Sequence, residues 1–353
     1  MLALVTEPGR AGTARIAEVP DPPGDRGFVR LRALEVGVCG TDREIVAGHF
    51  GVAPRGRDTL VLGHELLAEV IADDHGFRRG DLVAATVRRS CRRCAACDAG
   101  SPDACLSGAY TERGITALDG FASELVSEWP ELLVPVPARL REVGVLAEPA
   151  AVCVRALRHA RAVGMRQPWR PARALVLGTG AIGMLAAVLL RLDGLEVWVG
   201  GLEPPSGPAA ALVAALGARY VQGGPGAVPA AAADAGGFDV VLEAAGDGDL
   251  IAASLGLLAR NGVAVILGID GRARDVTVDG RTLGVDLVLG NRSILGSVNA
   301  HADDWHAAVA GLAAAFAAHG DVLGQLVALR VAPDRFAEAL AHRGVKATLA
   351  FAG

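Results

Sequence analysis

Residues 174–183 read ALVLGTGAIG, and this stretch decides the fold that the sequence predicts. The apolar run 174–177 predicts a buried strand, and the helical spacing of 184–192 predicts a helix soon after it. Between them, glycines allow a tight turn and a close approach to the backbone. In this strand–turn–helix context, G-T-G-A-I-G predicts a phosphate-binding turn at a helix N-terminus rather than a plain tight turn.

The same pattern continues downstream. Strands are expected at 195–199, 238–243 and 263–267, alternating with helices at 208–216 and 250–258. A last helix is expected to begin near Asp303 as its cap and to end at Gly320. Strands that alternate with helices predict parallel βαβ units, so we expect an α/β fold with a doubly wound parallel sheet.

The chain before residue 152 has a different pattern. Short runs rich in Val, Leu and Ile at 2–6, 28–36, 66–72 and 82–87 predict strands, and they are bounded by Gly, Pro and Asp. No long helical period interrupts them, so we expect a compact, mostly β domain. The Gly-, Pro- and Ala-rich segment 222–237 predicts a surface loop.

Four cysteines occupy a short segment with the spacing C-x2-C-x2-C-x7-C. Thiolates with two residues between them can bind one metal from a tight turn, and a closed set of four suits a structural zinc. The alternative, four unrelated small apolar residues, requires most of the chain's six cysteines to cluster by chance. The expected ligands are Cys91, Cys94, Cys97 and Cys105.

A second group of metal-binding residue types is scattered along the mostly β region. Cys39 lies in V-C-G-T-D, His64 and Glu65 lie in L-G-H-E, and Glu148 lies in L-A-E-P. A thiolate, an imidazole and carboxylates could hold a catalytic zinc with one open position. Taken singly, these residues could equally be a buried thiol, a core histidine and a helix N-terminal acid.

The residues that follow the carboxyl end of the second expected strand, 195–199, are Gly200-Gly201-Leu202-Glu203. An acid there binds the adenosine ribose of NAD, whereas an arginine accommodates the 2′-phosphate of NADP. Glu203 is the nearest acid and no arginine is present, so the sequence favours NAD over NADP. A solvated loop glutamate is the alternative.

These segments together resemble the zinc-dependent medium-chain dehydrogenase/reductase superfamily, and within it the glucose 1-dehydrogenase and polyol dehydrogenase branch. The matching segments run through nearly the whole chain. They are G-V-C-G-T-D-R-E-I (37–45), L-V-L-G-H-E (60–65), F-R-R-G-D-L-V (77–83), the four-cysteine segment, Y-T-E-R-G-I (110–115), L-A-E-P (146–149), G-T-G-A-I-G (178–183) and G-S-V-N (296–299).

The resemblance implies a GroES-like catalytic domain over 1–151, with a structural zinc lobe over 88–108. It also implies a Rossmann domain over 152–300 and a return to the catalytic domain over 301–353. A catalytic zinc would be held by Cys39, His64 and Glu148, with Glu65 as a nearby or exchanging ligand. An acid at 148, where ethanol-type members carry cysteine, points to the sugar and polyol branch.

The resemblance also assigns residues to substrate and cofactor. Thr41 would contact the substrate hydroxyl and pass on its proton, Glu112 and Asn299 would hold sugar hydroxyls, and Lys346 would reach the 2′-phosphate of NADP. The residues expected at the cofactor are Gly178, Thr179, Gly180, Ala181, Ile182, Gly183, Glu203, Gly268, Asn299 and Lys346.

Three departures from the family pattern stand out. Gly201-Leu202-Glu203 replaces the Asn-Arg-Arg of the glucose enzymes, which argues against NADP, while Lys346 argues for it. Val154 stands where many relatives carry a second glutamate. His49 stands where relatives commonly carry a lysine, and it could join a proton relay or lie solvated in a loop.

Composition limits the partners. The net charge of −5, with both signs interspersed, argues against a nucleic-acid partner. The N-terminus has no signal-peptide pattern and no apolar run has the length of a membrane span, so we expect a cytoplasmic protein. Arginine accounts for every basic residue except Lys346, a bias that points to a GC-rich bacterial genome.

The sequence therefore predicts a zinc-dependent NAD(P) oxidoreductase that oxidises a hydroxyl of a sugar or polyol, as a homo-dimer or homo-tetramer. One alternative is a biosynthetic dehydrogenase of a modified sugar, cyclitol or other polar alcohol. Another is a non-catalytic nucleotide-binding protein on the same fold.

Overall fold

The computed structural model describes residues 1–24, 27–223, 228, 236–271 and 275–351. The chain forms two compact units. The first comprises Met1–Ala151, Asn299–Ala313 and Val327–Gly353, and the second comprises Val152–Val298 and Ala314–Leu326. Most of the loop predicted at 222–237 lies outside the described residues.

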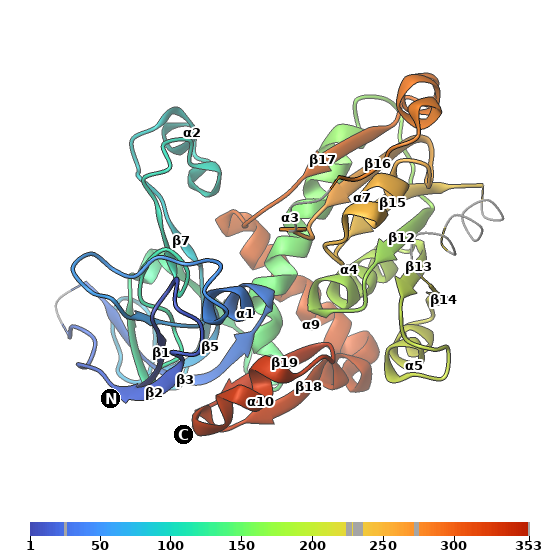
Figure 1. The fold of residues 1–353 in the computed structure, drawn as a ribbon. Helices are drawn as coiled ribbons and strands as arrows, with labels where there is room; N and C mark the ends of the chain where they lie inside the picture. Colours follow the sequence, from blue (N-terminus) through green and yellow to red (C-terminus); the bar gives the residue numbers. More distant parts are fainter. Residues whose placement is uncertain (25–26, 224–227, 229–235, 272–274, 352–353) are drawn as a thin grey trace. The chain divides into compact units, whose positions relative to one another are not determined.

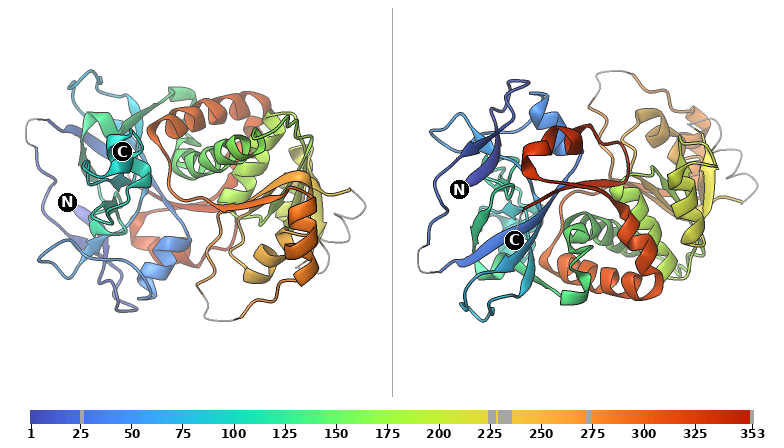
Figure 2. Two further views of the ribbon diagram at one scale, coloured as in Figure 1. Left: turned by 90° about the horizontal axis from the view of Figure 1, so that it is seen from above. Right: turned by 90° about the horizontal axis from the view of Figure 1, so that it is seen from below.

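The first unit is built on a mostly antiparallel sheet in the order β11-β6-β5-β3-β19-β18, with β10 also paired to β3. In strand β3, buried Val29, Leu31 and Ala33 alternate with exposed Arg30 and Arg32, and the alternation breaks at a register shift between Ala33 and Glu35, beyond which Val36 and Val38 are also buried. The C-terminal strand β19 pairs with β3, so red and blue strands run side by side in Figure 2. The strands are β3 (Val29–Val38), β5 (Glu65–Val70), β6 (Leu82–Ala85), β10 (Leu125–Glu128), β11 (Leu133–Val136), β18 (Val327–Val331) and β19 (Lys346–Ala350).

Two smaller sheets and three short helices complete this unit. One sheet contains β1 (Leu2–Thr6), β2 (Arg15–Glu18) and β4 (Leu60–Val61), and the other contains β7 (Arg88–Arg89), β8 (Thr111–Arg113) and β9 (Ala117–Leu118). The helices are α1 (Gly40–Val46), α2 (Ala95–Asp98) and α10 (Phe336–Ala341). The segment between β7 and β8, which includes α2, stands apart from β1 and β5 (Figure 1).

The second unit contains a six-stranded sheet in the order β14-β13-β12-β15-β16-β17, with every pair parallel. Counted along the unit, this order is 3-2-1-4-5-6, that of a doubly wound nucleotide-binding fold. The predicted fold class is therefore confirmed. The strands are β12 (Arg173–Leu177), β13 (Glu196–Gly201), β14 (Arg219–Gln222), β15 (Phe238–Glu243), β16 (Leu258–Ile266) and β17 (Ser293–Gly296).

Helices accompany these strands. Helix α4 is buried from Gly183 through Leu190, which explains why its sequence is apolar on every side. The helix expected at 250–258 is wrong at both ends, because Asp247 caps it at Gly248 and it ends at Ser254. Strand β16 already begins at Leu258. The helices are α3 (Ala147–Gly164), α4 (Ala181–Leu192), α5 (Pro208–Ala215), α7 (Gly248–Ser254) and α8 (Leu287–Leu289).

The last long helical segment, α9 (Ala302–Leu326), begins one residue before the expected cap. It contains a kink at His319 (φ −144°, ψ 41°) where two helices meet, so the first of them ends close to the expected Gly320. His301 is its cap, because the imidazole accepts the N–H of Asp303 while the Asp304 carboxylate accepts the N–H of His301. By length and composition α9 is the one helix among the described residues that could cross a membrane. Its buried Trp305 and Leu312, two turns apart, fit a core helix equally well.

Candidate functional site

Cys39 lies where β3 gives way to α1. Its backbone is extended, and its thiol accepts the N–H of Thr41 at 3.2 Å. The Asp42 carboxylate accepts the N–H of Cys39 at 2.9 Å and closes a reciprocal cap. The helix start therefore fixes the sulfur in place.

His64 reaches the same sulfur from the segment after β4. Its Nε2 lies 3.1 Å from Cys39 Sγ, and its Nδ1 lies 3.6 Å from Asp42 Oδ1. Gly63 precedes it with φ +87°, and a Cβ on Gly114 would lie 2.5 Å from the Gly63 carbonyl oxygen. Two glycines are thus required where this turn packs against the 111–118 segment.

Glu65, the first residue of β5, is the third member of the cluster, and it forms an unexpected ion pair with Lys346. Lys346 Nζ lies 2.6 Å from both carboxylate oxygens of Glu65, and both side chains are 2% exposed. Glu65 lies on β5 and Lys346 lies on β19. Both strands pair with β3, which explains how two residues so distant in sequence meet. One ligand atom from each of Cys39, His64 and Glu65 falls within 4.8 Å of the others.

Glu148, at the start of α3, is not part of that tight group but is electrostatically linked to it. Burial raises the pKa of Glu148 to about 7, and the charge of Glu65 adds to the effect. Burial alone would lower the pKa of His64, but the negative charges of Cys39 and Asp42 outweigh it and raise that pKa well above 6.5. A set of anions gathered around one imidazole is suited to a cation.

The donor set fits zinc. Zinc–sulfur and zinc–nitrogen bonds of tetrahedral geometry place the two donor atoms roughly 3.5 Å apart, close to the separation of Cys39 Sγ and His64 Nε2. Asp42 faces the other ring nitrogen, as the second-shell acid of a zinc-bound histidine does. Cys39, His64 and either Glu65 or Glu148 would hold the ion.

Gly37 lies directly opposite Glu65 on β3, and this pairing leaves no room for a side chain. A Cβ at position 37 would lie 1.9 Å from Glu65 Oε2. We expect Gly37→Ala to displace the Glu65 carboxylate from Lys346 and to cost about 1–3 kcal/mol of stability. The thermal unfolding midpoint measures this cost.

Gly40→Ala is the matched control, because a Cβ on Gly40, the first residue of α1, would have no neighbour within 4 Å. Its midpoint is expected to stay near that of the wild type. Equal midpoints for the Gly37 and Gly40 variants would show that Glu65 is not held where the structure places it.

The four remaining candidate ligands form a second cluster in the lobe between β7 and β8. The Sγ separations are 3.9 Å for Cys91–Cys97, 3.5 Å for Cys94–Cys97 and 3.9 Å for Cys94–Cys105. Tetrahedral zinc with four thiolates requires about 3.8 Å. Backbone N–H groups lower the pKa of Cys94 to about 7, and the Ser107 hydroxyl lowers that of Cys105 to about 6, so both thiols ionise readily.

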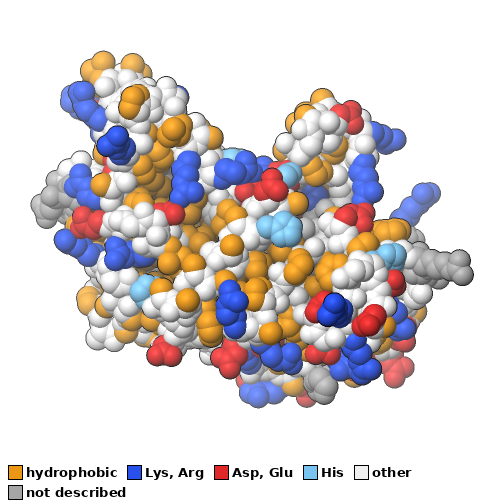
Figure 3. Space-filling view, turned by 180° about the vertical axis from the view of Figure 1, so that it is seen from behind, with side chains coloured by type: hydrophobic (Ala, Val, Ile, Leu, Met, Phe, Trp, Pro, Cys, Tyr) orange, Lys and Arg blue, Asp and Glu red, His pale blue; other side chains and the backbone are white. Residues whose placement is uncertain are grey.

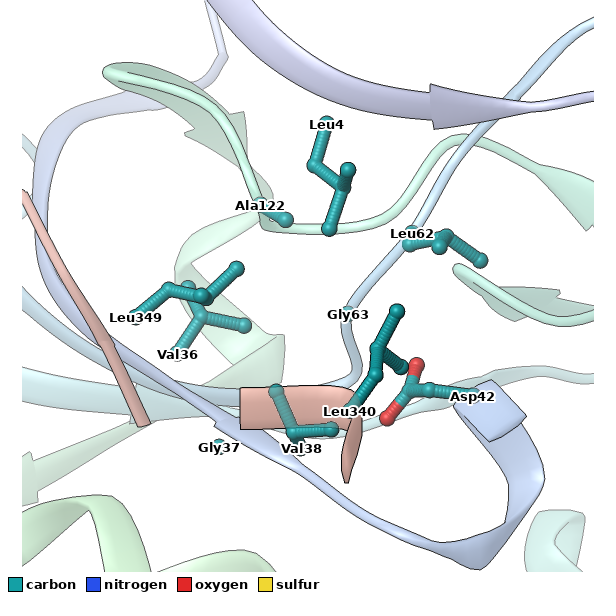
Figure 4. Close-up of a pocket in the computed structure, with 10 residues that line it drawn as sticks. All are labelled: Leu4, Val36, Gly37, Val38, Asp42, Leu62, Gly63, Ala122, Leu340 and Leu349. Carbon is teal, nitrogen blue, oxygen red and sulfur yellow. The ribbon is translucent and has the colours of Figure 1, made fainter. Parts of the chain in front are cut away.

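A small cavity lies beside Asp42 in the first unit (Figure 4). Its volume is about 10 Å³, and Asp42 is the one charged residue among an otherwise apolar lining that includes Val38 and Leu340. This volume is at the lower limit for one water molecule, so the cavity cannot receive a sugar.

The expected substrate residues lie in the first unit. Thr41 is half-buried in the first turn of α1, and Glu112 lies on β8 paired with Arg88. Asn299 has φ +66° and donates to the Asp103 carbonyl at 3.2 Å. His49 is 70% exposed and pairs with Glu44, which places it in solvent.

The G-T-G-A-I-G turn occupies the carboxyl end of β12. A Cβ on Gly183 would lie 2.0 Å from the Gly178 carbonyl oxygen, so helix and turn pack too closely for a side chain there. A Cβ on Gly180, by contrast, would point into open space, and Gly180 is the N-cap of α4. This open helix N-terminus fits a dinucleotide pyrophosphate.

The other residues expected at the cofactor do not all lie in the second unit. Gly268 follows β16, and a Cβ there would lie 2.2 Å from Gly246 N, so it packs on the turn after β15. Glu203 follows β13 and accepts the N–H of Ala209, in the first turn of α5, at 3.1 Å. Lys346 does not fit its expected role at a 2′-phosphate, because its ammonium group is buried in the first unit and bound by Glu65.

Sequence reasoning missed two residues of the site, Asp42 and Gly37, and it missed the pairing of Glu65 with Lys346. Asp42 occurs in the sequence only as the last residue of V-C-G-T-D, and nothing local there indicates that it faces His64. A signal for Lys346 existed, since it is the only lysine in the chain. Nothing local in the sequence shows that it lies beside Glu65, because that contact spans 281 residues.

Comparison with known proteins agrees with this geometry. Residues 25–138 match the alcohol dehydrogenase GroES-like domain, and residues 141–351 match the glucose dehydrogenase C-terminus. The structure of Haloferax mediterranei glucose dehydrogenase in complex with NADP, Zn and gluconolactone superposes with a TM-score of 0.91 at 31% identity, covering 100% of both chains.

Curated relatives give the same result. Glucose 1-dehydrogenase of Methanocella arvoryzae is 39% identical over 305 residues, which cover 85% of each chain. Glucose 1-dehydrogenase of Thermoproteus tenax is 38% identical over 356 residues, which cover 99% of each chain.

A GroES-like unit with a cysteine–histidine–carboxylate cluster, joined to a doubly wound nucleotide-binding unit, defines a zinc-dependent dehydrogenase of the medium-chain class. Such enzymes act as oxidoreductases on CH–OH donors. The chain belongs to the glucose dehydrogenase branch of the zinc-dependent medium-chain dehydrogenase/reductase superfamily.

Proposed function

We propose that this enzyme oxidises the anomeric hydroxyl of an aldose such as glucose to the lactone, and that it passes the hydride to NAD(P). The observation that carries the proposal is the convergence of Cys39, His64 and Glu65 around one point beside Glu148. The similarity to glucose 1-dehydrogenases, and to a glucose dehydrogenase solved with gluconolactone, supports the choice of sugar.

Different residues would bind the zinc, transfer the proton and hold the sugar. Cys39 and His64, with Glu148 or Glu65, would hold zinc, and Asp42 would orient the His64 ring. When bound, the zinc lowers the pKa of the substrate hydroxyl and the nicotinamide accepts the hydride. Thr41 would accept the hydroxyl proton and pass it outward. Glu112 and Asn299 would accept and donate hydrogen bonds to the other sugar hydroxyls.

A specific observation favours a second candidate. Val154, half-buried on α3, stands where many relatives carry a glutamate, so one carboxylate for a sugar hydroxyl is missing. The enzyme would then act on a modified sugar, a cyclitol or another polar alcohol. The same protein fold would serve either substrate.

A substrate-by-cofactor activity matrix tests the proposal. We expect glucose and galactose to be oxidised and cyclitols and keto-sugars to be poor substrates. Turnover of cyclitols or keto-sugars in preference to aldoses would support the second candidate. Tight NAD(P)H binding without any alcohol or carbonyl turnover would contradict both and favour a non-catalytic protein.

The same matrix tests cofactor choice, for which we predict NAD over NADP. Glu203 is held at the carboxyl end of β13 by Ala209 N–H and by the Tyr220 hydroxyl, which donates to its carbonyl at 2.7 Å. Residues 199–218 contain no basic residue that could bind a 2′-phosphate. We expect kcat/KM to be roughly tenfold higher with NAD, the size of one modest polar interaction. A preference for NADP would contradict this assignment.

We further propose a cytoplasmic homo-oligomer from a bacterial source that has no nucleic-acid partner. Positive and negative side chains are interspersed on the face drawn in Figure 3. Strand β17 is the edge of its sheet. Ile294 on this strand is 41% exposed, and Val298, two residues beyond its end, is 65% exposed. An exposed apolar edge of this kind suits pairing with a second copy, as a dimer or within a tetramer.

A further inference from the structure

Arg88 is the only charged side chain that the structure pairs with the expected sugar-binding carboxylate among the described residues. On the β7–β8 ladder it lies directly opposite Glu112. Its Nε and Nη2 donate to Glu112 Oε1 at 3.0 and 2.9 Å. Both side chains are largely buried, 11% and 15% exposed, so solvent screens this pair less than a surface ion pair.

The third donor of the same guanidinium binds the cysteine lobe. Arg88 Nη1 donates to the Asp103 carbonyl oxygen at 2.6 Å, two residues before Cys105. The guanidinium also lies over the Tyr110 ring, 4.0 Å from its centroid. Planar donors in a fixed fork, stacked on an aromatic ring, leave Arg88 little freedom.

That one carbonyl oxygen serves both expected sugar-binding residues. Asn299 Nδ2 donates to the Asp103 carbonyl at 3.2 Å, and nearby His301 Nε2 lies 3.0 Å from the Gly100 carbonyl oxygen. Glu112 is linked to the Asp103 carbonyl indirectly, because Arg88 donates to both. The base of the lobe therefore fixes the spacing of an acceptor, Glu112, and of an amide, Asn299.

Glu112 keeps one oxygen for a ligand. Oε1 takes both Arg88 donors, whereas Oε2 accepts only the Thr116 hydroxyl, at 3.4 Å, among the hydrogen bonds of the described residues. A carboxylate oxygen has room for more than one donor. A sugar hydroxyl could thus bind Oε2 while Arg88 holds the carboxylate from the other side.

We propose that Arg88 is a positioning residue for substrate affinity: it orients Glu112 toward the sugar and sets its distance from Asn299 through the Asp103 carbonyl of the cysteine lobe. This inference deepens the proposed function and rests on it. The alternative is a purely structural role, in which Arg88 only stabilises the pairing of β7 with β8.

Steady-state kinetics of the full-length, zinc-containing enzyme separate the two roles. For Arg88→Ala we expect the KM for glucose to rise about tenfold to a hundredfold, the value of a lost charge-assisted hydrogen bond, with kcat and the KM for NAD(P) changed much less. Arg88→Lys keeps the charge but loses the fork, so an intermediate rise is expected. Arg93→Ala, which removes an exposed arginine from the same lobe, is the matched control.

A double-mutant comparison identifies the route of the effect. If Arg88 acts through Glu112, the KM of Arg88→Ala/Glu112→Gln will be close to that of Glu112→Gln alone. KM increases that multiply would contradict the coupling. Zinc content and the thermal unfolding midpoint, measured on every variant, report whether the fold and the lobe are intact.

The outcomes are distinguishable. Wild-type enzyme without sugar or polyol turnover would overturn the proposed function, and this inference with it. Normal wild-type turnover with an unchanged sugar KM in Arg88→Ala would overturn the inference alone. If Arg88→Ala does not fold, Arg88→Lys decides, because a folded variant with the wild-type KM gives the same negative answer.

Discussion

Replacing Cys39 by serine is expected to lower turnover by at least about a thousandfold while the protein stays folded. The thiolate is one of the strong zinc donors at the site, and a serine hydroxyl is a poor substitute at neutral pH. Losing a Lewis acid removes several kcal/mol of transition-state stabilisation, and each 1.4 kcal/mol is about tenfold in rate. Initial rates under saturating sugar and cofactor measure the loss.

Cys153→Ser is the matched control for this experiment. Cys153 is buried on α3, and its thiol donates to the Ile182 carbonyl at 3.2 Å, a bond that a serine hydroxyl can keep. Its turnover is expected to stay close to that of the wild type. A Cys39→Ser enzyme with near-normal turnover would contradict a catalytic role for the Cys39 cluster.

Lys346→Met is expected to be the most destabilising single substitution described here. It leaves the Glu65 carboxylate buried without its charge partner, and breaking a buried pair in this way costs about 3–5 kcal/mol. In a protein of this size that corresponds to a fall of about 4–7 °C in the thermal unfolding midpoint. Calorimetry of the purified variant measures it.

The double variant Lys346→Met/Glu65→Gln shows whether the unpaired charge is the cause. Because glutamine keeps the shape of Glu65 without its charge, the double variant should be more stable than Lys346→Met alone. If the second substitution destabilises further, Lys346 stabilises the fold by packing rather than by pairing with Glu65. Arg343→Met, an exposed neighbour, controls for loss of positive charge.

The parts of the fold that were predictable are those in which the signal is local. Strands β1 and β15 have the expected bounds, and the turn after β12 is placed by its glycines, because alternation and turn chemistry act over a few residues. The grouping of Cys91, Cys94, Cys97 and Cys105 was equally local, since all four fall within fifteen positions. These signals depend on no distant partner.

The sequence-based predictions are wrong where contacts between distant segments, or the choice of capping residue, determine the structure. The helix expected at 250–258 ends early at Ser254 so that β16 can begin at Leu258, and its apolar residues do not distinguish the two states. His301, not Asp303, caps α9, because an imidazole can act as a capping acceptor. Lys346 was assigned to the cofactor from its position near the C-terminus, but strand pairing places it beside Glu65.

The arrangement of the candidate metal site was only partly predictable. Cys39, His64 and Glu65 were named from family motifs, and the structure brings them together. Which carboxylate completes the set could not be read from the sequence, since Glu65 and Glu148 are both nearby and their charges interact. Strand register and helix position decide that question.

Zinc-edge anomalous diffraction from crystals of the zinc-containing enzyme tests the central claim most directly. We predict two anomalous peaks per chain, as for one structural and one catalytic zinc. One should lie among the four lobe sulfurs, and the other within bonding distance of Cys39 Sγ and His64 Nε2. A single peak in the lobe, with no metal between Cys39 and His64 in an active enzyme, would contradict it.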